Sequence, residues 1–103
     1  MSEDDREAVR RVQAGDTEAF EPLVEKYKRK VFRLAYQVLR DQEEALDVSQ
    51  EAFVKAFRAL PAFKGDSAFY TWLFRITMNV ALIRSGLSRW VSDDGMVCVA
   101  LGR

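Results

Sequence analysis

The sequence predicts an all-α fold, a compact bundle of three long helices and one short N-terminal helix. Apolar residues recur every three or four positions over long stretches, which is the spacing of one helix face. Residues 1–85 contain no alternation typical of a strand, no internal repeat and no low-complexity segment. Glycine, proline and capping residues divide the chain into four helical segments. We therefore expect one helical domain over residues 1–86 and an irregular tail over residues 87–103.

Composition restricts the classes of function. The chain has 103 residues, enough for one core, and 49% hydrophobic with 31% charged residues is a balance typical of soluble globular proteins. With no His and one Cys, the usual ligands of a metal site and the usual parts of a cysteine nucleophile are missing. We expect no metal, no cofactor and no enzymatic activity. Short apolar runs and an acidic N-terminus argue against membrane insertion and secretion, so a cytoplasmic location is expected.

The first half of the chain predicts a short helix followed by a long one. The short helix covers about residues 4–14 and is ended by Gly15. The long helix restarts near Asp16 and runs to residue 39. Pro22 removes one backbone hydrogen bond, so we expect a kink or a late start there. One side of this helix carries an apolar stripe made of Phe20, Val24, Tyr27, Val31, Leu34, Ala35 and Val38.

A third helix is predicted between the capping pair Asp41 and Glu44 and the helix-breaking Pro61. Its expected core stripe consists of Leu46, Phe53, Ala56, Phe57 and Leu60. A different face carries charged and amide side chains around one apolar residue: Asp47, Gln50, Glu51, Val54 and Arg58. Such a face is typical of a docking patch, and it is also compatible with a solvated helix surface that carries one stray Val.

The fourth helix is expected to begin at Asp66 or Ser67, either of which is able to cap it. Its predicted core stripe contains Phe69, Leu73, Ile76, Val80 and Ile83. A flank beside that stripe contains Ala68, Trp72, Arg75, Asn79 and Leu82. Trp stacks on bases, Arg neutralises phosphates and Asn pairs with base edges, so this flank suits nucleic acid. Core packing of Trp72 and solvation of Arg75 and Asn79 remain the alternative.

The loop between the last two helices combines an aromatic ring, a cation, a flexible glycine and short polar side chains in five positions: Phe63, Lys64, Gly65, Asp66 and Ser67. These residues suffice for a small pocket that holds one unstacked base by stacking and hydrogen bonding. An ordinary helix-helix turn in which Phe63 fills the core explains the same residues.

The net charge of zero conceals a strong segregation of charge along the chain. Residues 26–40 contain six basic side chains and no acid: Lys26, Lys28, Arg29, Lys30, Arg33 and Arg40. Residues 41–51 contain five acids and no base. A basic stripe suits DNA phosphates and an acidic patch suits a basic protein surface, so the pairing indicates a domain that bridges the two.

Two motifs resemble a known family. They are Asp47-Val-Ser-Gln-Glu-Ala-Phe53 and Phe63-Lys-Gly-Asp-Ser-Ala-Phe-Tyr-Thr-Trp-Leu-Phe-Arg-Ile76, with Gly15-Asp-Thr-Glu-Ala-Phe20 upstream. In order and spacing they resemble region 2 of bacterial extracytoplasmic-function (ECF) sigma factors of the sigma-70 family. The resemblance covers about residues 5–81.

This resemblance implies recognition and melting of the −10 promoter element on behalf of RNA polymerase. It implies docking on the clamp helices of the polymerase β′ subunit by Asp47, Gln50 and Glu51. We add Val54 and Arg58 because they lie on the same helix face. The implied contacts with single-stranded −10 DNA are Phe63, Lys64, Gly65, Asp66, Ser67, Trp72, Arg75 and Asn79. An anti-sigma factor that covers these faces is a further implied partner.

The sequence also departs from the family. Ile83 stands where a second base-reading amide is usual, and we expect the linker and region 4, the second DNA-binding domain of the family, to be absent. Two alternatives therefore stay open. One is a truncated interaction module that binds polymerase or an anti-sigma factor without specific DNA readout. The other is an unrelated helical bundle whose aromatic residues only form a core.

Overall fold

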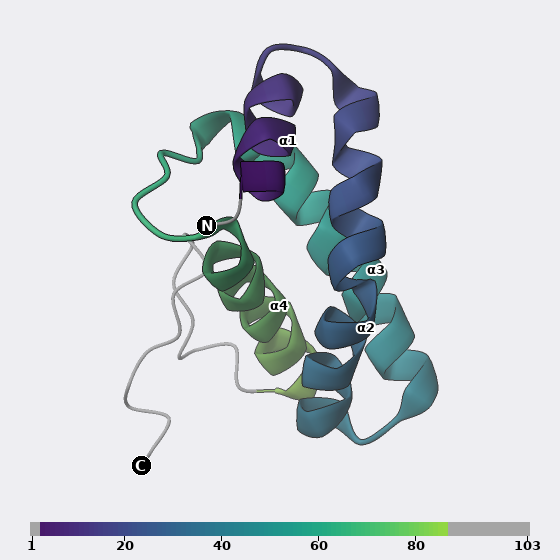
Figure 1. Cartoon of the computed structure of the whole chain (residues 1–103). Coiled ribbons are helices and arrows are strands. Elements are labelled where there is room, and N and C mark those ends of the chain that lie inside the picture. Colours follow the sequence, from purple (N-terminus) through teal and green to yellow (C-terminus); the bar gives the residue numbers. More distant parts are fainter. Residues whose placement is uncertain (1–2, 87–103) are drawn as a thin grey trace.

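The computed structural model describes residues 3–86 and confirms the all-α fold (Figure 1). Within that range, four α-helices and two short 3₁₀ turns follow one another, and there is no strand. They are α1 (Glu3–Gln13), η1 (Thr17–Ala19), α2 (Phe20–Leu39), α3 (Gln42–Ala59), η2 (Leu60–Ala62) and α4 (Phe69–Ser85). The tail predicted over residues 87–103 lies outside the described residues. None of the described helices is long and apolar enough to cross a membrane.

The predicted short and long helices in the first half of the chain are confirmed, but α2 begins at Phe20 and not near Asp16. Gly15, with φ of 111°, follows α1, and a 3₁₀ turn then leads into α2 at Phe20. Pro22 consequently lies in the first turn of α2, where its missing N–H removes no helical hydrogen bond. The late start, rather than a kink, is therefore how the chain accommodates this proline.

The capping prediction for α3 is confirmed for Asp41 and differs for Glu44. Asp41 Oδ1 accepts a hydrogen bond of 2.9 Å from the Glu44 backbone N–H, which satisfies one free donor of the first turn. The Glu44 carboxylate does not complete the reciprocal capping box. It accepts instead from Arg84 on α4, at 2.6 Å, and so joins two helices.

The core lies where α2, α3 and α4 pack against one another. Its largest fully enclosed side chains come from all of these helices and from η2, and they include Phe69, Leu60 and Leu23. The buried side of α3 contains four small residues beside Val48 and Phe53, namely Ala45, Ser49, Ala52 and Ala56. Small residues let helix backbones approach closely, and each fully buried Leu or Phe contributes about 1.5–3 kcal/mol.

Two residues predicted for the core lie outside it. Leu46 is 51% exposed although Phe53, seven residues later on the same stripe, is buried. The difference arises because the Phe20 ring of α2 covers Phe53 at a centroid distance of 6.4 Å, whereas Leu46 lies farther along, in a groove that stays open. Ile83 is 48% exposed, although the two preceding residues of α4, Ala81 and Leu82, are buried.

The predicted cap of α4 was also wrong. The helix begins at Phe69, and Ala68 occupies the N-cap position without a side-chain cap. Asp66 and Ser67 remain in the preceding loop, where they line a hollow instead of reaching the first N–H groups of the helix. Their side-chain oxygens are therefore not used to cap α4.

Helix α1 joins α2 to the loop between α3 and α4, which lies at the same end of the bundle (Figure 1). Asp5 is only 3% exposed and accepts hydrogen bonds from the Tyr27 hydroxyl and, at 2.8 Å, from Lys26 Nζ. At the other end of α1, Gln13 Nε2 donates to the carbonyl oxygens of Leu60, at 3.0 Å, and Phe63, at 2.9 Å. Helix α1 therefore fixes the path of the chain where the loop begins.

Candidate functional site

The loop and the start of α4 enclose a hollow of about 390 Å³, here called the loop hollow. It is lined by Ala62, Phe63, Lys64, Asp66, Ser67, Trp72 and Arg75. Six of the eight residues predicted to contact DNA are therefore on one concave surface. A volume of this order accommodates a single small planar group, with apolar, cationic and hydrogen-bonding groups within reach of it.

Two aromatic rings form one wall of the loop hollow. The centroids of Phe63 and Trp72 lie 4.7 Å apart with an interplanar angle of 40°. Phe63 also packs edge-on against the fully buried Phe69, at 6.4 Å and 87°. Both interpretations of Phe63 consequently apply, since its ring packs against the core on one side and lines the hollow on the other.

The polar side chains around these rings differ in charge. Lys64 and Arg75 are exposed cations, and Asp66 and Ser67 supply oxygen acceptors on the same surface. Cations beside an aromatic wall attract phosphate groups, while short acceptors reach the donors of a base edge. The arrangement fits a nucleotide better than a neutral apolar ligand.

Gly65 and Asn79, the other two predicted DNA contacts, lie apart from the loop hollow. Gly65 has φ of 80°, a left-handed conformation that favours glycine, and it lines a different hollow between the loop and α1. Asn79 is half-buried on α4, and its Oδ1 is enclosed without a hydrogen bond from the described residues. Base reading by Asn79 therefore requires its amide to rotate outward. Leu82, expected on the same flank, is buried.

The face of α3 predicted to bind polymerase, here called the α3 face, is accessible along its whole length. All five of its residues are exposed: Asp47, Gln50, Glu51, Val54 and Arg58. Val54 in particular leaves 48% of its surface uncovered, although it is apolar. These residues thus form a continuous surface on one helix, as the periodicity predicts.

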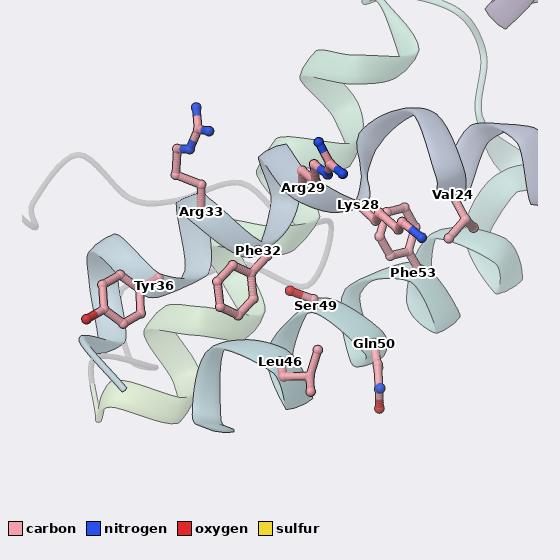
Figure 2. A pocket seen from close by; sticks show the side chains of 10 residues that line it. All are labelled: Val24, Lys28, Arg29, Phe32, Arg33, Tyr36, Leu46, Ser49, Gln50 and Phe53. Atoms are coloured by element: carbon pink, nitrogen blue, oxygen red, sulfur yellow. The ribbon is translucent and has the colours of Figure 1, made fainter. Parts of the chain in front are cut away.

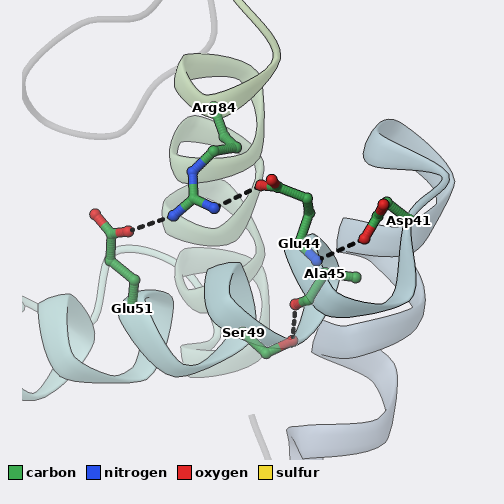
Figure 3. Close-up of polar contacts among 6 residues, drawn as sticks. All are labelled: Asp41, Glu44, Ala45, Ser49, Glu51 and Arg84. Carbon is green, nitrogen blue, oxygen red and sulfur yellow. Dashed lines mark hydrogen bonds and ion pairs between the residues drawn. The ribbon is translucent and has the colours of Figure 1, made fainter.

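Part of the α3 face is linked to α4 by Arg84 (Figure 3). Its guanidinium donates to Glu44 at 2.6 Å and lies 3.6 Å from a Glu51 oxygen. The hydrogen bond to Glu44, with the charges of Glu44, Glu51 and Asp47, raises the pKa of Arg84 above its ordinary value. Among residues 3–86, Asp47 forms no ion pair. Of the two carboxylates on the α3 face, Asp47 is therefore more available to a partner than Glu51.

A groove between α2 and α3 was not predicted from the sequence. It has a volume of about 630 Å³ and a mostly apolar lining of rings and aliphatic chains, with cations of α2 along its edge (Figure 2). Its lining comprises Val24, Lys28, Arg29, Phe32, Arg33, Tyr36, Leu46, Ser49, Gln50 and Phe53. Gln50 belongs both to this α2–α3 groove and to the α3 face, so the two are continuous.

The signal for this groove was present in the sequence as large apolar residues that fit no core stripe. Phe32 and Tyr36 fall outside the stripe predicted for α2, and both lie on the groove with their rings 6.2 Å apart. Exposed apolar surface of this kind commonly marks a protein-binding site. Residues 3–86 contain no group of His, Cys, Asp and Glu able to hold a metal ion.

A comparison with protein families identifies the domain. The model of the family described as Sigma-70 region 2 matches residues 23–85, more than half of the chain. The chain belongs to the sigma-70 region 2 family. The match includes α3, the loop hollow and α4, so the residues discussed above lie within the family domain.

Known sigma factors share much of the sequence of this region 2 chain. It is 56% identical over 79 residues to the RNA polymerase sigma-H factor of Pseudomonas aeruginosa, covering 77% of this chain and 41% of the relative. It is 52% identical over 77 residues to the ECF RNA polymerase sigma-E factor of Escherichia coli K12, covering 75% and 40%. The chain therefore spans about two fifths of the length of these relatives.

A solved structure shares the fold of this region 2 chain. It is the NMR structure of an engineered region 2 of sigmaE in complex with GTAAAA. The TM-score is 0.73 at 44% sequence identity, and the match covers 84% of this chain and 95% of that one. Fold and sequence comparisons thus agree on the same family.

Proposed function

We propose that the chain acts as the region 2 part of an ECF sigma factor, recognising and melting the −10 promoter element. The observation that supports this most directly is the loop hollow, in which two aromatic rings, two cations and two oxygen acceptors surround a space suited to one base. Membership of the sigma-70 region 2 family and the likeness to a sigmaE region 2 in complex with GTAAAA support it independently. The proposal requires no covalent chemistry from this chain.

The physical basis of melting is capture of a base after it leaves the stack. Unstacking and unpairing one base costs a few kcal/mol. Stacking on an aromatic side chain contributes about 1–3 kcal/mol per base, so the rings of Phe63 and Trp72 offset most of that cost. Lys64 and Arg75 then supply phosphate contacts, while Asp66 and Ser67 accept hydrogen bonds from the base. A base that lacks matching donors leaves these acceptors unpaired, which is how the hollow discriminates between bases.

The decisive experiment measures binding of Phe63→Ala to single-stranded −10 DNA and to scrambled DNA. Loss of the stacking wall is expected to weaken −10 binding about 10-fold to 100-fold, the equivalent of about 1–3 kcal/mol, and scrambled binding far less. Phe32→Ala, which changes a half-buried ring in the α2–α3 groove, is the matched control and should leave the preference intact.

Two outcomes would contradict this proposal. Equal losses of Phe63→Ala on −10 and scrambled DNA would refute base readout, and absence of any preference in the unmodified chain would favour the interaction module without specific readout. Phe63 also contacts the core, so thermal melting must first establish that the variant is folded. Arg75→Ala, at an exposed position, is expected to weaken both DNAs alike because it removes a phosphate contact.

The α3 face and the α2–α3 groove are proposed to dock on the β′ clamp helices of RNA polymerase. The support is the accessible carboxylate of Asp47 beside exposed Val54, continuous through Gln50 with an apolar groove. Such a surface, apolar with a charged rim, suits a stable protein partner. Binding to isolated clamp helices tests the docking. An anti-sigma factor on the same surface would have to compete with those helices, and simultaneous binding of both would exclude it. A partner of this kind implies a cytoplasmic location.

A further inference from the structure

Helices α2 and α3 form a hairpin with an apolar outer side. The two helices are joined only by Arg40 and Asp41, and the α2–α3 groove runs between them. Phe32 and Leu46 line this groove from the two helices (Figure 2). Tyr36 and Leu46 leave 39% and 51% of their surfaces uncovered. Exposed apolar surface gathered on one side of a small domain commonly marks an interface.

The two helices carry opposite charges near the end where they are joined. Helix α2 and its C-cap contribute Arg33 and Arg40, whereas α3 contributes Glu43 and Asp47, and all four side chains are exposed. Within residues 3–86, none of the four forms an ion pair. The apolar groove therefore has a basic rim on one side and an acidic rim on the other. Such a face is complementary to a second copy of itself, turned so that each rim meets the opposite one.

The positions of these residues along the helices agree with that arrangement. At 1.5 Å per residue, Arg33 lies about 9 Å from the end of α2 and Asp47 about 8 Å from the start of α3. Tyr36 and Leu46 lie about 5 Å and about 6 Å from the same two ends. A two-fold axis along the hairpin preserves these heights and exchanges the two helices. It therefore places Arg33 against Asp47 of the second copy, and Tyr36 against Leu46 of the second copy.

The apolar centre and the two charged rims are here called the hairpin face, which comprises Phe32, Arg33, Tyr36, Arg40, Glu43, Leu46 and Asp47. We propose that two copies of the chain associate through the hairpin face, and that the dimer covers the surface proposed to dock on polymerase. The dimer itself is independent of the proposed function, whereas its competition with the clamp helices rests on that function. Because the net charge of the chain is zero, no overall repulsion opposes the association.

The dimer is expected to be weak and reversible. A face that is two helices wide and about 27 Å long, the length of α3, buries on the order of 1,000 Å² in total, at the lower end of specific interfaces. Ion pairs at an exposed rim contribute orientation more than affinity. We therefore expect a dissociation constant of about 10–100 μM, so that the dimer forms at high concentration and yields to a partner that binds more tightly.

The test is sedimentation equilibrium of the 103-residue chain over about 1–500 μM, with charges exchanged between the two rims. Arg33→Glu and Asp47→Arg each create two like-charged contacts in a symmetric dimer, so each should weaken association about tenfold or more. An equimolar mixture of these two variants should recover association, because both contacts then join opposite charges. The double variant Arg33→Glu/Asp47→Arg should also recover it, and its net charge equals that of the unmodified chain.

Glu3→Arg is the matched control for net charge. It makes the same change as Asp47→Arg at an exposed position of α1, and Glu3 does not line the α2–α3 groove. This variant should dimerise like the unmodified chain. The inference is overturned if the unmodified chain stays monomeric throughout the concentration range, or if the mixture and the double variant associate no better than the single variants.

Competition with polymerase is measured by adding isolated clamp helices to the dimer, which should dissociate it into single chains. A complex that contains two copies of the chain together with clamp helices would refute the shared surface. Failure of the proposed docking has a different signature, namely a chain that dimerises at high concentration but does not bind the clamp helices when it is diluted to the monomer.

Discussion

At the scale of single residues, the buried contact between Asp5 and Tyr27 makes stability depend on pH. Asp5 is 3% exposed, and the Tyr27 hydroxyl donates to it from within the core. Burial, followed by the hydrogen bond and charge of Asp5, raises the pKa of Tyr27 above its ordinary value. The neutral phenol is thus favoured in the folded state. Its contribution to stability is complete below the unfolded pKa of about 10 and is lost as pH rises above it.

Tyr27→Phe is therefore expected to lower the free energy of unfolding by about 1–3 kcal/mol at pH 7, because a buried carboxylate loses a donor. Above pH 10 the unmodified chain should lose stability more steeply than this variant. Urea denaturation at pH 7 and between about pH 9 and 11 measures both effects. Tyr36→Phe, at a 39% exposed position on α2, is the control and should keep the alkaline loss. Parallel pH profiles for Tyr27→Phe and the unmodified chain would contradict this account.

Not every core residue was predictable from the sequence. Phe53, Leu60, Phe69 and Leu73 were predictable because large apolar side chains at helical spacing are normally buried. Leu46 satisfied the same criterion and is exposed, since burial depends on which side chain of another helix covers it. Conversely, Ala45, Ser49 and Ala52 are buried at helical spacing on α3 but were not predicted for the core, because they are small or polar and the prediction relied mainly on large apolar side chains.

At the scale of elements, α1 acts on the loop hollow without lining it. Gln13 donates to the carbonyl oxygens of Leu60 and Phe63 and so holds the loop at the point where Phe63 turns toward Trp72. Gln13→Ala removes both hydrogen bonds and should speed amide exchange of residues 63–67 and weaken −10 binding about fivefold, the effect of about 1 kcal/mol. Gln13→Glu should be worse still, because a carboxylate placed against two carbonyl oxygens has no hydrogen to donate.

Gln42→Ala, at an exposed position on α3, is the control for Gln13 and should change neither quantity. The order unmodified chain, Gln13→Ala, Gln13→Glu is the specific expectation for −10 affinity. If Gln13→Glu binds and exchanges like the unmodified chain, the two hydrogen bonds do not position the loop. Exchange rates of α2 amides, which should be unaffected, separate this local effect from general destabilisation.

Elements were easier to predict than the spaces between them. The α-helices, the late start at Pro22 and the Asp41 cap follow from local rules about backbone hydrogen bonds. The loop hollow was partly predictable, because its residues are consecutive or one turn apart. Phe32 and Tyr36 indicated extra apolar surface on α2, but the α2–α3 groove itself was not predictable, since it combines residues of two helices whose pairing depends on tertiary packing.

At the scale of the whole molecule, the domain presents two kinds of surface on different elements. The loop hollow carries aromatic rings and cations, whereas the α3 face carries carboxylates beside an apolar groove. A domain with a net charge of zero attracts neither DNA nor a basic protein by its overall field. Local segregation of charge must therefore supply both attractions, and the two surfaces should be separable by mutation.

Asp47→Lys tests this separation. Asp47 is exposed and forms no ion pair within residues 3–86, so reversal of its charge should leave the fold intact. Reversal of this charge is expected to weaken the proposed binding to the β′ clamp helices about tenfold, while the ratio of −10 to scrambled DNA binding stays unchanged.

The matched control is Glu18→Lys, which makes the same change in net charge at an exposed position before α2, whereas Asp47 lies near the start of α3, beyond the other end of α2. If docking depends on the local carboxylate, Glu18→Lys should weaken clamp-helix binding by less than about twofold at physiological salt, where charges beyond about 8 Å are largely screened. Equal weakening by both variants would mean that only the overall field matters, and the α3 face would lose its proposed role. A changed DNA preference in Asp47→Lys would show instead that the two surfaces are coupled through the ion pairs that Arg84 forms between α3 and α4.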